Sequence, residues 1–363
     1  MTSVKPTGVI ARPGDAIGIL GGGQLGRMLA IAAADMGLDV HIFTPESDSP
    51  ASRVARKTWV AKWEDEAALK EFAASITVAT IEFENVPVAA TNLIEAQGKP
   101  TRPGGQTLAR AQDRLAEKTF FREIGIEPAP FERIDGPDDI QSALDRLGGN
   151  GVLKSRFSGY DGKGQVRLKG KAPASAWADV GGKPSVLEAW IAHDREISVI
   201  AARSASGEFV AFDPPENDHS GGILRKSAFP STAPRSVLEE AKAMARKLAE
   251  ALDYVGVLAL ELFITTDGKL LANEFAPRVH NSGHWTQDAC RTGQFEQHIR
   301  AVCGWPLGDP TRWADGEMIN LLGDDASGWE TVLAEGAKLH LYGKRHAADG
   351  RKMGHLVRLK PRT

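Results

Sequence analysis

The sequence contains few of the features that mark secreted, membrane-embedded or nucleic-acid-binding proteins. Its two cysteines, Cys290 and Cys303, are too few for a disulfide framework and stand in no metal-ligand spacing, which favours a reducing compartment. No apolar run approaches the roughly 18 residues that a membrane-spanning helix needs, and residues 1–15 lack the apolar core of a signal peptide. The 44 Lys and Arg nearly cancel the 47 Asp and Glu, so no overall charge draws the chain to nucleic acid or to a membrane. We therefore expect a cytoplasmic protein that binds any anionic ligand through a local cluster of side chains.

The length and the hydrophobic pattern indicate a globular protein of several domains. With 363 residues, 42% of them apolar and 25% charged, the chain can bury two or three cores. Predicted strands over 16–20, 39–43 and 77–83 alternate with helical segments such as 24–36, which is typical of a parallel sheet with helices on both faces.

The remainder of the chain divides at a Pro-rich segment and at a change of composition. We predict a helix over 107–124 with Thr107 as its N-cap, a Gly-rich section from about 128 to 190, and a long amphipathic helix over 236–252. Short β-like segments follow residue 306. The predicted domains are 1–112, 113–190, 191–305 and 306–363.

Two glutamates flank the strongest turn signal of the chain, Asp267-Gly268, which lies between two apolar, β-rich segments. Directly opposed residues of a hairpin have Cβ atoms roughly 5 Å apart, where two carboxylates repel by about 3 kcal/mol at an effective dielectric of 20. Such a pair needs a shared proton, an Arg or Lys, or a divalent cation, unless the hairpin is solvated and both side chains point to water. For a two-residue turn the predicted pairs are Thr266 with Lys269, Phe263 with Ala272, and Glu261 with Glu274.

The segment 21–26 fits the pattern G-x-G-x-x-G between a predicted strand and a predicted helix. Its glycines allow a tight turn at a helix N-terminus that favours an anion. Glu46, twenty residues past Gly26, stands about where a ribose-binding acid is expected, which suits a nicotinamide-dependent oxidoreductase. The loop is equally compatible with a substrate phosphate, or with close packing of the helix on the sheet.

Lys154 closes an apolar strand and precedes the glycine-rich loop 159–164. An ammonium group beside free amide groups commonly binds nucleotide phosphates, although the spacing here is not that of a Walker A loop. The alternative is a hairpin turn with a solvated Lys. Further on, the apolar segment 186–191 leads to Glu196, which suits either an adenine slot with a ribose-binding carboxylate or an ordinary edge strand.

Two further segments carry candidate polar groups. His280 and His284 stand four residues apart, as zinc ligands on a helix would, but Gly283 between them disfavours a helix. We therefore expect hydrogen-bonding groups for a polar ligand, or a buried polar turn. Near the C-terminus, Arg351 and Lys352 lie between glycines, which suits a phosphate clamp or a solvated charged turn.

Taken in chain order, the Lys-plus-glycine loop, the strand followed by an acid, and the opposed carboxylates resemble the ATP-grasp superfamily. The segments 23–28, 159–165, 273–285 and 350–355 resemble the 5-(carboxyamino)imidazole ribonucleotide synthase family more closely, and the resemblance covers about residues 16–358. The run 273–285 is highly specific, whereas the glycine motif by itself is weak. The resemblance implies an α/β and α+β fold: an ATP-grasp fold with an N-terminal Rossmann-like domain and a small C-terminal β-rich domain.

The resemblance also implies an ATP- and bicarbonate-dependent carboxylation of aminoimidazole ribonucleotide in purine biosynthesis. ATP would phosphorylate bicarbonate to carboxyphosphate, and the exocyclic amine of the substrate would capture this intermediate or the CO₂ released from it. The implied ligands are ATP, Mg²⁺ and these small-molecule substrates, with no nucleic acid and no membrane. The family is usually homodimeric.

Carried over residue by residue, the resemblance divides the site into an ATP side, a metal pair and a substrate side. Mg²⁺ would lie between Glu261 and Glu274 and neutralise both. The ATP side comprises Arg114, Lys154, Gly159, Tyr160, Asp161, Gly162, Lys163, Gly164, Gln165, Glu188, Ala189, Trp190, Ile191, Glu196, His219, Asn273 and Glu274. The substrate side comprises Gln24, Leu25, Glu82, Asn281, Ser282, Arg351, Lys352 and Arg358, and the catalytic candidates are Tyr160, Arg278, His280 and Lys352.

A departure from the superfamily pattern and three rival hypotheses accompany this interpretation. Many ATP-grasp enzymes have an Asn two residues after the second metal Glu, where this chain has Ala276, but the closer family shares that Ala. The rivals are a different ATP-grasp carboxylase or formyl-transferring ligase, the nicotinamide-dependent oxidoreductase, and a nucleotide sensor without catalysis.

Overall fold

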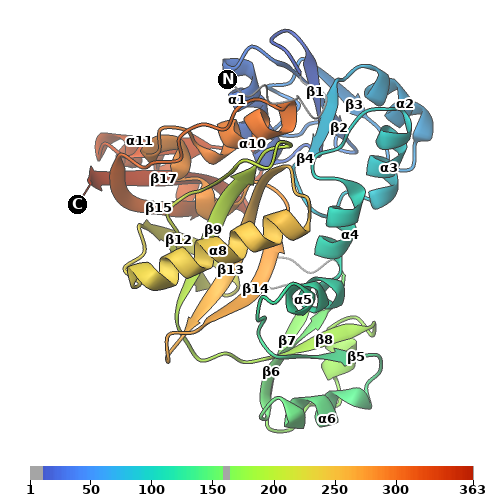
Figure 1. The fold of residues 1–363 in the computed structure, drawn as a ribbon, viewed down its shortest axis with the longest axis vertical. Helices are drawn as coiled ribbons and strands as arrows, with labels where there is room; N and C mark the ends of the chain where they lie inside the picture. The colour runs from blue at the N-terminus through green and yellow to red at the C-terminus, as the bar shows by residue number, and fades with distance from the viewer. Residues whose placement is uncertain (1–10, 158–163, 363) are drawn as a thin grey trace.

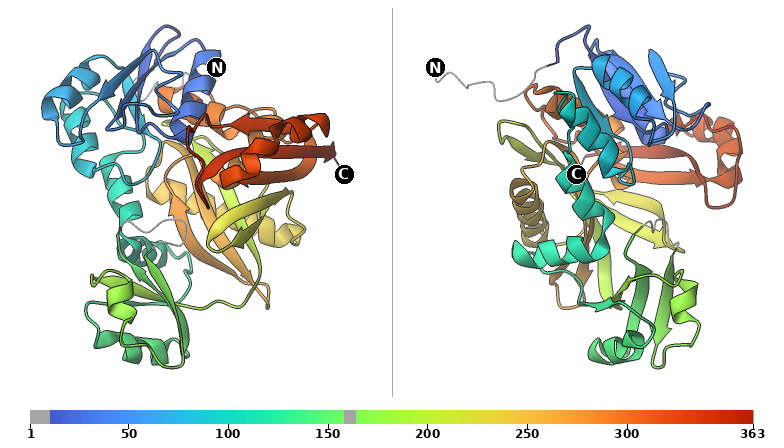
Figure 2. Two further views of the ribbon diagram at one scale, coloured as in Figure 1. Left: turned by 180° about the vertical axis from the view of Figure 1, so that it is seen from behind. Right: turned by 90° about the vertical axis from the view of Figure 1, so that its right-hand side faces the viewer.

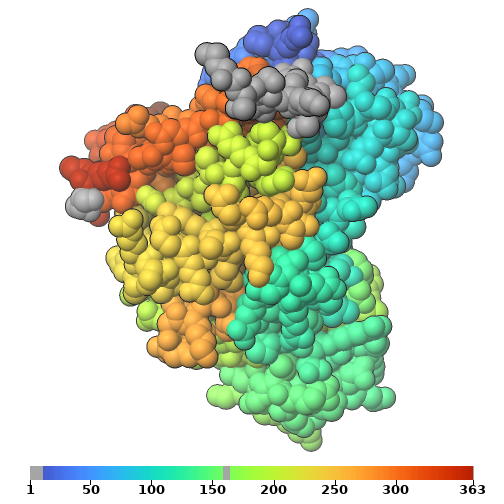
Figure 3. Space-filling model, viewed as in Figure 1, coloured from blue at the N-terminus to red at the C-terminus, as the bar shows by residue number. Residues whose placement is uncertain are grey.

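The computed structural model describes residues 11–157 and 164–362, in which the strands form three sheets of four, four and nine strands. We call them the N-terminal sheet (strands within 16–81), the small sheet (131–189) and the large sheet (193–361). The N-terminal sheet lies at one end of the molecule, the small sheet at the other and the large sheet between them (Figure 1), and Figure 2 shows the same order from two other directions. The small sheet and its helices project from the remainder of the molecule (Figure 3).

The N-terminal sheet is parallel throughout, in the order β3-β2-β1-β4. Every residue of β4 is buried, as expected for a parallel sheet with both faces covered. This arrangement confirms the α/β alternation predicted for the first hundred residues. Its elements are β1 (Ala16–Leu20), α1 (Gln24–Asp35), β2 (Asp39–Thr44), β3 (Lys57–Val60), α2 (Glu66–Ala74), β4 (Val78–Ile81), α3 (Val88–Ala96) and α4 (Gly105–Gln112).

The predicted single helix over 107–124 is wrong, because Asp113 divides it into α4 and α5 (Arg114–Glu123). Asp113 has extended backbone angles, φ −116° and ψ 106°, and its side chain accepts a hydrogen bond from the Leu115 amide. It therefore caps α5, and the predicted cap, Thr107, lies inside α4. Arg156 also binds Asp113, through its Nε at 2.9 Å. The break places α5 between the large and small sheets (Figure 1).

The small sheet is antiparallel, in the order β5-β8-β6-β7, and α6 packs on it. Leu153, Leu168 and Leu187 form its core with Ile140 and Leu144 of the helix. This core is separate from that of the large sheet. The elements are β5 (Phe131–Ile134), α6 (Asp139–Arg146), β6 (Asn150–Ser155), β7 (Gln165–Lys169), α7 (Ala176–Asp179) and β8 (Ser185–Ala189).

The large sheet runs β14-β13-β9-β11-β12-β15-β17-β16, with β10 added beside β9. The β-like segments predicted after residue 306 extend this sheet, because β15 pairs with β12. The helix predicted over 236–252 is confirmed as α8, which packs on β9 and β13 through buried Ala241, Ala245 and Leu248. Across the described residues, no helix is both long and apolar enough to cross a membrane.

The remaining elements are β9 (His193–Arg203), β10 (Phe209–Ala211), β11 (Glu216–Ser220), β12 (Ile223–Phe229), α8 (Arg235–Ala251), β13 (Gly256–Thr265), β14 (Leu270–Ala276), α9 (Thr286–Ala289), α10 (Gln294–Cys303), β15 (Ala314–Leu322), α11 (Trp329–Ala334), β16 (Lys338–Leu341) and β17 (Lys352–Pro361). Short 3-10 turns occupy Asn281–Gly283 and Gly323–Gly328.

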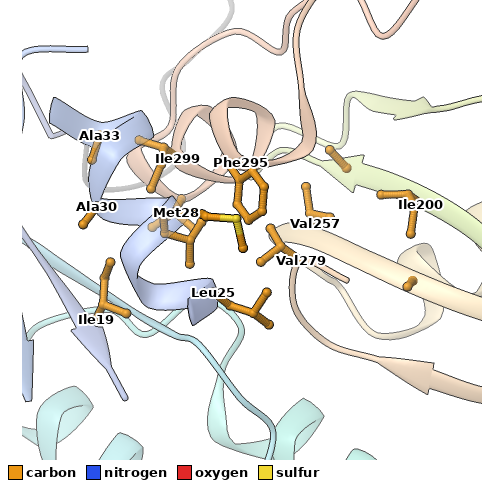
Figure 4. Packing of buried hydrophobic residues seen from close by; sticks show 14 of the residues in the cluster. Ile19, Leu25, Met28, Ala30, Ala33, Ile200, Val257, Val279, Phe295 and Ile299 are labelled. Atoms are coloured by element: carbon orange, nitrogen blue, oxygen red, sulfur yellow. The ribbon is translucent and has the colours of Figure 1, made fainter. Parts of the chain in front are cut away.

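One hydrophobic core joins the N-terminal sheet to the large sheet. Met28 of α1 and Phe295 of α10 lie together between the two sheets (Figure 4), with Ile19 on one side and Val257 on the other. A continuous apolar core fixes these two parts relative to each other, because separating them would expose it to water. Between them and the small sheet lies α5, which packs on both β14 and β8.

Candidate active site

The two glutamates of the predicted hairpin meet at a β-bulge. Leu262 pairs with Ala272 and Leu260 pairs with Phe275, so the two residues between them on β14, Asn273 and Glu274, both face Glu261. A bulge of this kind inserts one extra residue into one strand and bends it.

The bulge corrects the predicted register. The Thr265 amide donates to the Lys269 carbonyl at 2.9 Å, so the turn has three residues, with Gly268 at φ +84°. The predicted pairs Thr266–Lys269 and Phe263–Ala272 are therefore wrong by one residue. The extra residue of β14 restores the register, and Glu261 faces Glu274 as predicted.

The carboxylate of Glu274 contacts one cation and lies near a second. Its Oε2 accepts a hydrogen bond from Arg114 Nη1 at 3.0 Å, while 40% of its side-chain surface remains exposed. Burial alone would raise the pKa of Glu274, but the charges of Arg114 and Lys154 outweigh burial and hold this pKa at about 2. Glu274 is therefore ionised at neutral pH.

The pKa of Glu261 is shifted in the opposite direction from that of Glu274. Burial, followed by repulsion from Glu274, raises the pKa of Glu261 to about 7. His280 Nε2 lies 3.2 Å from its Oε1. In the described part of the chain, no three or more His, Cys, Asp or Glu side chains cluster closely enough to hold a metal. The two carboxylates still fit a hard cation that takes further oxygen ligands from a phosphate, because such a cation would relieve the repulsion that raises the pKa of Glu261.

Glu188 of β8 is buried between two lysines. Its Oε2 lies 2.9 Å from Lys154 Nζ and 3.2 Å from Lys118 Nζ. Burial would raise the pKa of Glu188, but the two lysines outweigh it and lower this pKa. Its other oxygen, Oε1, is buried without a hydrogen-bond partner among the described residues. An acceptor of this kind suits the amino group of a purine base.

Sequence reasoning missed two buried ionisable residues on α5, Glu117 and Lys118, and burial raises the pKa of Glu117 to about 8. Glu117 Oε1 accepts a hydrogen bond from the Phe275 amide at 2.7 Å, and Lys118 Nζ donates to the Asn273 carbonyl at 2.9 Å. The helical period could have found them, because Arg114, Glu117, Lys118 and Phe121 are spaced to share one face. Since Phe121 is apolar, that face is expected to be buried.

Glu196 lies between two histidines at the start of β9. Its carboxylate oxygens lie 2.6 Å from His219 Nδ1 and 3.2 Å from His193 Nε2. Burial would lower the pKa of His219, but Glu196 and the charge of Glu261 together outweigh burial and raise it. Trp190, just after β8, is 42% exposed, and the Arg167 guanidinium lies 3.6 Å from its ring centre. Ala189 and Ile191 on either side of it are half-buried.

The glycine loop next to β7 falls only partly within the described residues. Gly159, Tyr160, Asp161, Gly162 and Lys163 lie outside them. Gly164 has φ +70° and its carbonyl accepts from the Ser155 amide, while Gln165 pairs with Lys154 across β6 and β7.

The N-terminal glycine loop is occupied by a carboxylate of the chain itself. The amides of Gly23 and Gly26 donate to the two oxygens of Glu82, at 2.7 and 2.9 Å. Glu82 therefore takes the anion position at the start of α1, where a dinucleotide would place its pyrophosphate. Gln24 begins α1 and Leu25 is buried against the core.

The polar side chains of the segment after β14 contact several different partners. Arg278 pairs with Glu84 near the N-terminal sheet. His280 Nδ1 lies 2.8 Å from Ser282 Oγ, which lies 2.7 Å from Ser198 Oγ. The amide groups of Asn281 exchange two hydrogen bonds with Asn320, at 2.8 and 3.1 Å.

His280 and His284 point to different partners, and zinc is not favoured. His284 is fully buried, and its Nδ1 lies 2.9 Å from Gln294 Nε2, whereas His280 faces Glu261. The spacing of four residues does not bring the two rings to one point, because the segment is a 3-10 turn and not an α-helix.

The basic residues of the C-terminal region lie on and beside β17. Arg351 is exposed and donates to the His346 carbonyl, and Lys352 is half-buried. Arg358 binds Glu335 at 2.9 Å and lies 3.6 Å from Glu317. The roles predicted for these residues stay predictions.

Comparison with known proteins divides the chain into three family domains, of which the second spans the small sheet and part of the large sheet. Residues 15–112 match the ribonucleotide synthetase preATP-grasp domain, 119–295 the ATP-grasp domain, and 317–362 the phosphoribosylaminoimidazole carboxylase C-terminal domain. The N5-carboxyaminoimidazole ribonucleotide synthase of Brucella melitensis is 51% identical over 356 residues, covering 97% of this chain and 98% of the relative. This chain belongs to the N5-carboxyaminoimidazole ribonucleotide synthase family.

Two solved structures of the family share the fold. An ADP complex of an N5-carboxyaminoimidazole ribonucleotide synthetase matches with a TM-score of 0.94 at 40% identity, covering 98% of this chain and 94% of that one. The Aspergillus clavatus synthase, solved with ADP and 5-aminoimidazole ribonucleotide, matches with a TM-score of 0.88 at 27% identity, covering 96% and 94%. The ATP-grasp fold expected from the sequence is thus confirmed. The chain is an ATP-grasp ligase, and the dinucleotide interpretation of the glycine loop is wrong.

Proposed function

We propose that this chain uses ATP and bicarbonate to carboxylate 5-aminoimidazole ribonucleotide on its exocyclic amine, releasing ADP and phosphate. The observation that carries the proposal is the meeting of Arg114, Lys154 and Glu188 with the Glu261–Glu274 pair where the small and large sheets approach. Cations, a buried acceptor and paired carboxylates match the phosphates, the base and the metal of a nucleotide.

On the ATP side, each group has a distinct task. Lys154 and Arg114 would bind the phosphates and stabilise the charge that develops on the transferred phosphoryl group. Glu188 Oε1, with Ala189, Trp190 and Ile191, would frame the adenine, and Glu196 with His219 would bind the ribose. The loop 159–165 and Asn273 would complete the phosphate site.

Glu261 and Glu274 would hold Mg²⁺, which when bound offsets both carboxylate charges and polarises the phosphoryl group. Before that, Arg114 keeps Glu274 ionised and His280 contacts Glu261. The pair is therefore already positioned to accept a cation.

On the substrate side, Arg278, His280 and Lys352 lie on segments adjoining the carboxylate pair and the C-terminal strands. With Tyr160, they are our catalytic candidates, and the other predicted substrate contacts are Gln24, Leu25, Glu82, Asn281, Ser282, Arg351 and Arg358. A bicarbonate oxygen attacks the γ-phosphorus and the bond to ADP breaks, giving carboxyphosphate. The exocyclic amine then attacks the carboxyl carbon of carboxyphosphate and displaces phosphate. Alternatively, carboxyphosphate first divides into CO₂ and phosphate, and the amine attacks the CO₂. In both cases the amine loses a proton.

The test is ADP release measured with bicarbonate, with and without 5-aminoimidazole ribonucleotide. We expect the nucleotide to stimulate ADP release and to be consumed in equal amount. If ADP release is unchanged by the nucleotide, the proposed substrate is wrong.

The family also suggests a cellular compartment and an oligomeric state. We infer a cytoplasmic homodimer, supported by the family's usual state and by two free, buried thiols. Burial raises the pKa of the Cys303 thiol to about 12, which keeps it unreactive. Light scattering of the purified chain tests the dimer, and the mass of a single chain would contradict it.

A further inference from the structure

The first half of α5 contacts Glu274 and its neighbours at three places, of which the proposed function uses one. Arg114 binds the Glu274 carboxylate. The other two contacts go to the backbone on either side of it: Glu117 accepts from the Phe275 amide, and Lys118 donates to the Asn273 carbonyl. The peptide groups before and after Glu274 are thus each held by a side chain of α5.

These two contacts complete the outer edge of the large sheet. β14 is its outermost strand, and at Ala272 its outer edge pairs with the main chain of residues 127–129. Beyond Ala272 comes the bulge that carries Asn273 and Glu274. Buried backbone groups require partners, and from this point the partners are side chains of α5.

The two side chains are almost completely buried, with Glu117 2% and Lys118 1% exposed. Burying a polar or ionisable side chain is costly unless it is hydrogen-bonded, so apolar residues would fill the same space at lower cost. A buried carboxyl group at position 117 therefore needs a reason beyond packing. Its hydrogen bond to the peptide group that follows Glu274 supplies one.

We infer that Glu117 is a positioning residue for Glu274. By fixing the Phe275 amide with an oxygen acceptor at a set distance, it holds the bulge in the form that aims the Glu274 carboxylate at the nucleotide-bound cation. This inference rests on the proposed function, in which Glu274 is a metal ligand. Groups that orient a metal ligand from behind typically change metal affinity 10–100-fold when they are altered.

The test separates the reach of the side chain from its ability to ionise at position 117. Glu117→Gln keeps an oxygen at the same reach but cannot ionise, whereas Glu117→Asp keeps the carboxyl group and withdraws the oxygen by one methylene. The quantity measured is the Mg²⁺ concentration at half-maximal ADP binding, obtained by calorimetric titration without turnover. We expect Glu117→Asp to raise it by about tenfold and Glu117→Gln by less than about twofold.

Amide hydrogen exchange in the nucleotide-free protein gives a second readout. The Phe275 amide should exchange faster in Glu117→Asp than in the wild type and should stay protected in Glu117→Gln. Glu123, which is exposed on the same helix, provides the matched controls Glu123→Asp and Glu123→Gln, and neither should change the exchange or the Mg²⁺ requirement. Thermal melting confirms that each variant is folded.

Two outcomes would overturn the inference. If Glu117→Gln is impaired and Glu117→Asp is not, Glu117 acts through an ionised carboxylate and not through the position of its oxygen. If Phe275 exchange accelerates in Glu117→Asp while the Mg²⁺ requirement is unchanged, the contact is only structural. Neither readout uses aminoimidazole ribonucleotide, so a wild type that binds Mg²⁺-ADP but does not carboxylate that nucleotide would contradict the proposed function alone.

Discussion

The carboxylate of Glu82 and the carboxylates of the Glu261–Glu274 pair occupy the two places where the sequence predicts a bound nucleotide. At the glycine loop, Glu82 binds the amides of Gly23 and Gly26, so backbone donors suited to a phosphate are already satisfied within the chain. At the hairpin, the partners are the side chains of Arg114 and His280, which a ligand can replace. The difference shows that glycines alone do not identify a phosphate-binding loop. The amides of such a loop must also be free of carboxylates from the same chain.

The largest effect that separates the two regions is expected from Glu274→Gln, which removes a metal carboxylate while preserving shape. Metal stabilisation of the transferred phosphoryl group is worth several kcal/mol, so we expect turnover to fall about a thousandfold or more, with melting unchanged. Steady-state ADP release measures it, and the exposed Glu71→Gln on α2 serves as control. Near-normal turnover would mean that the pair does not hold the catalytic metal.

The next effect is expected from Lys154→Met, which removes a cation predicted to bind ATP phosphate. Hydrogen bonds to charged groups contribute about 1.5–3 kcal/mol, so kcat/KM for ATP should fall by roughly ten- to a hundredfold. Lys171→Met, at an exposed position, should leave it unchanged. An unaltered kcat/KM for ATP would remove Lys154 from the nucleotide site.

At the glycine loop the expected effect is on stability. Glu82→Leu leaves the amides of Gly23 and Gly26 without their acceptor, so the free energy of unfolding should fall by about 1–3 kcal/mol. Urea denaturation measures the change. Equal stability of variant and wild type would show that Glu82 does not satisfy these amides in solution.

The smallest effect concerns the pH dependence of the hairpin without metal. The folded chain keeps a proton on Glu261 up to about pH 7, whereas an unperturbed glutamate releases it near 4.5, so unfolding releases a proton between these values. The contribution of Glu261 to stability therefore falls as pH rises from 4.5 to 7, by about 1 kcal/mol per unit. Comparing urea denaturation of wild type and Glu261→Gln at pH 5.5 and 6.5 isolates it. A difference in free energy of unfolding that does not change with pH would show that the pKa of Glu261 is not raised.

The sequence predicted what depends on local pattern. The parallel N-terminal sheet follows from alternating periodicity, and helix α8 from its apolar stripe. The opposition of Glu261 and Glu274 was predicted although the turn was assigned one residue too short, because the bulge at Asn273 compensates. Hairpin register depends on turn geometry and on bulges, which a pattern of residue types does not encode.

Contacts between segments that are distant in the chain could not be predicted from the sequence. Nothing local indicates that Glu82 fills the glycine loop 56–59 residues before it, or that Lys118 reaches Asn273, 155 residues away. The break at Asp113 likewise depends on its side-chain cap and on Arg156, which follows β6. In each case the contact is set by tertiary packing, and the sequence alone does not distinguish the actual partner from other residues of the same type.

Calorimetric titration of the purified chain with ADP and with NADH, each with and without Mg²⁺, tests the central claim most directly. The carboxylate pair should make ADP binding depend on Mg²⁺, this dependence should disappear in Glu274→Gln, and NADH should not bind. Mg²⁺-dependent ADP binding that survives in Glu274→Gln, or binding of NADH in place of ADP, would contradict the assignment of the nucleotide to the hairpin.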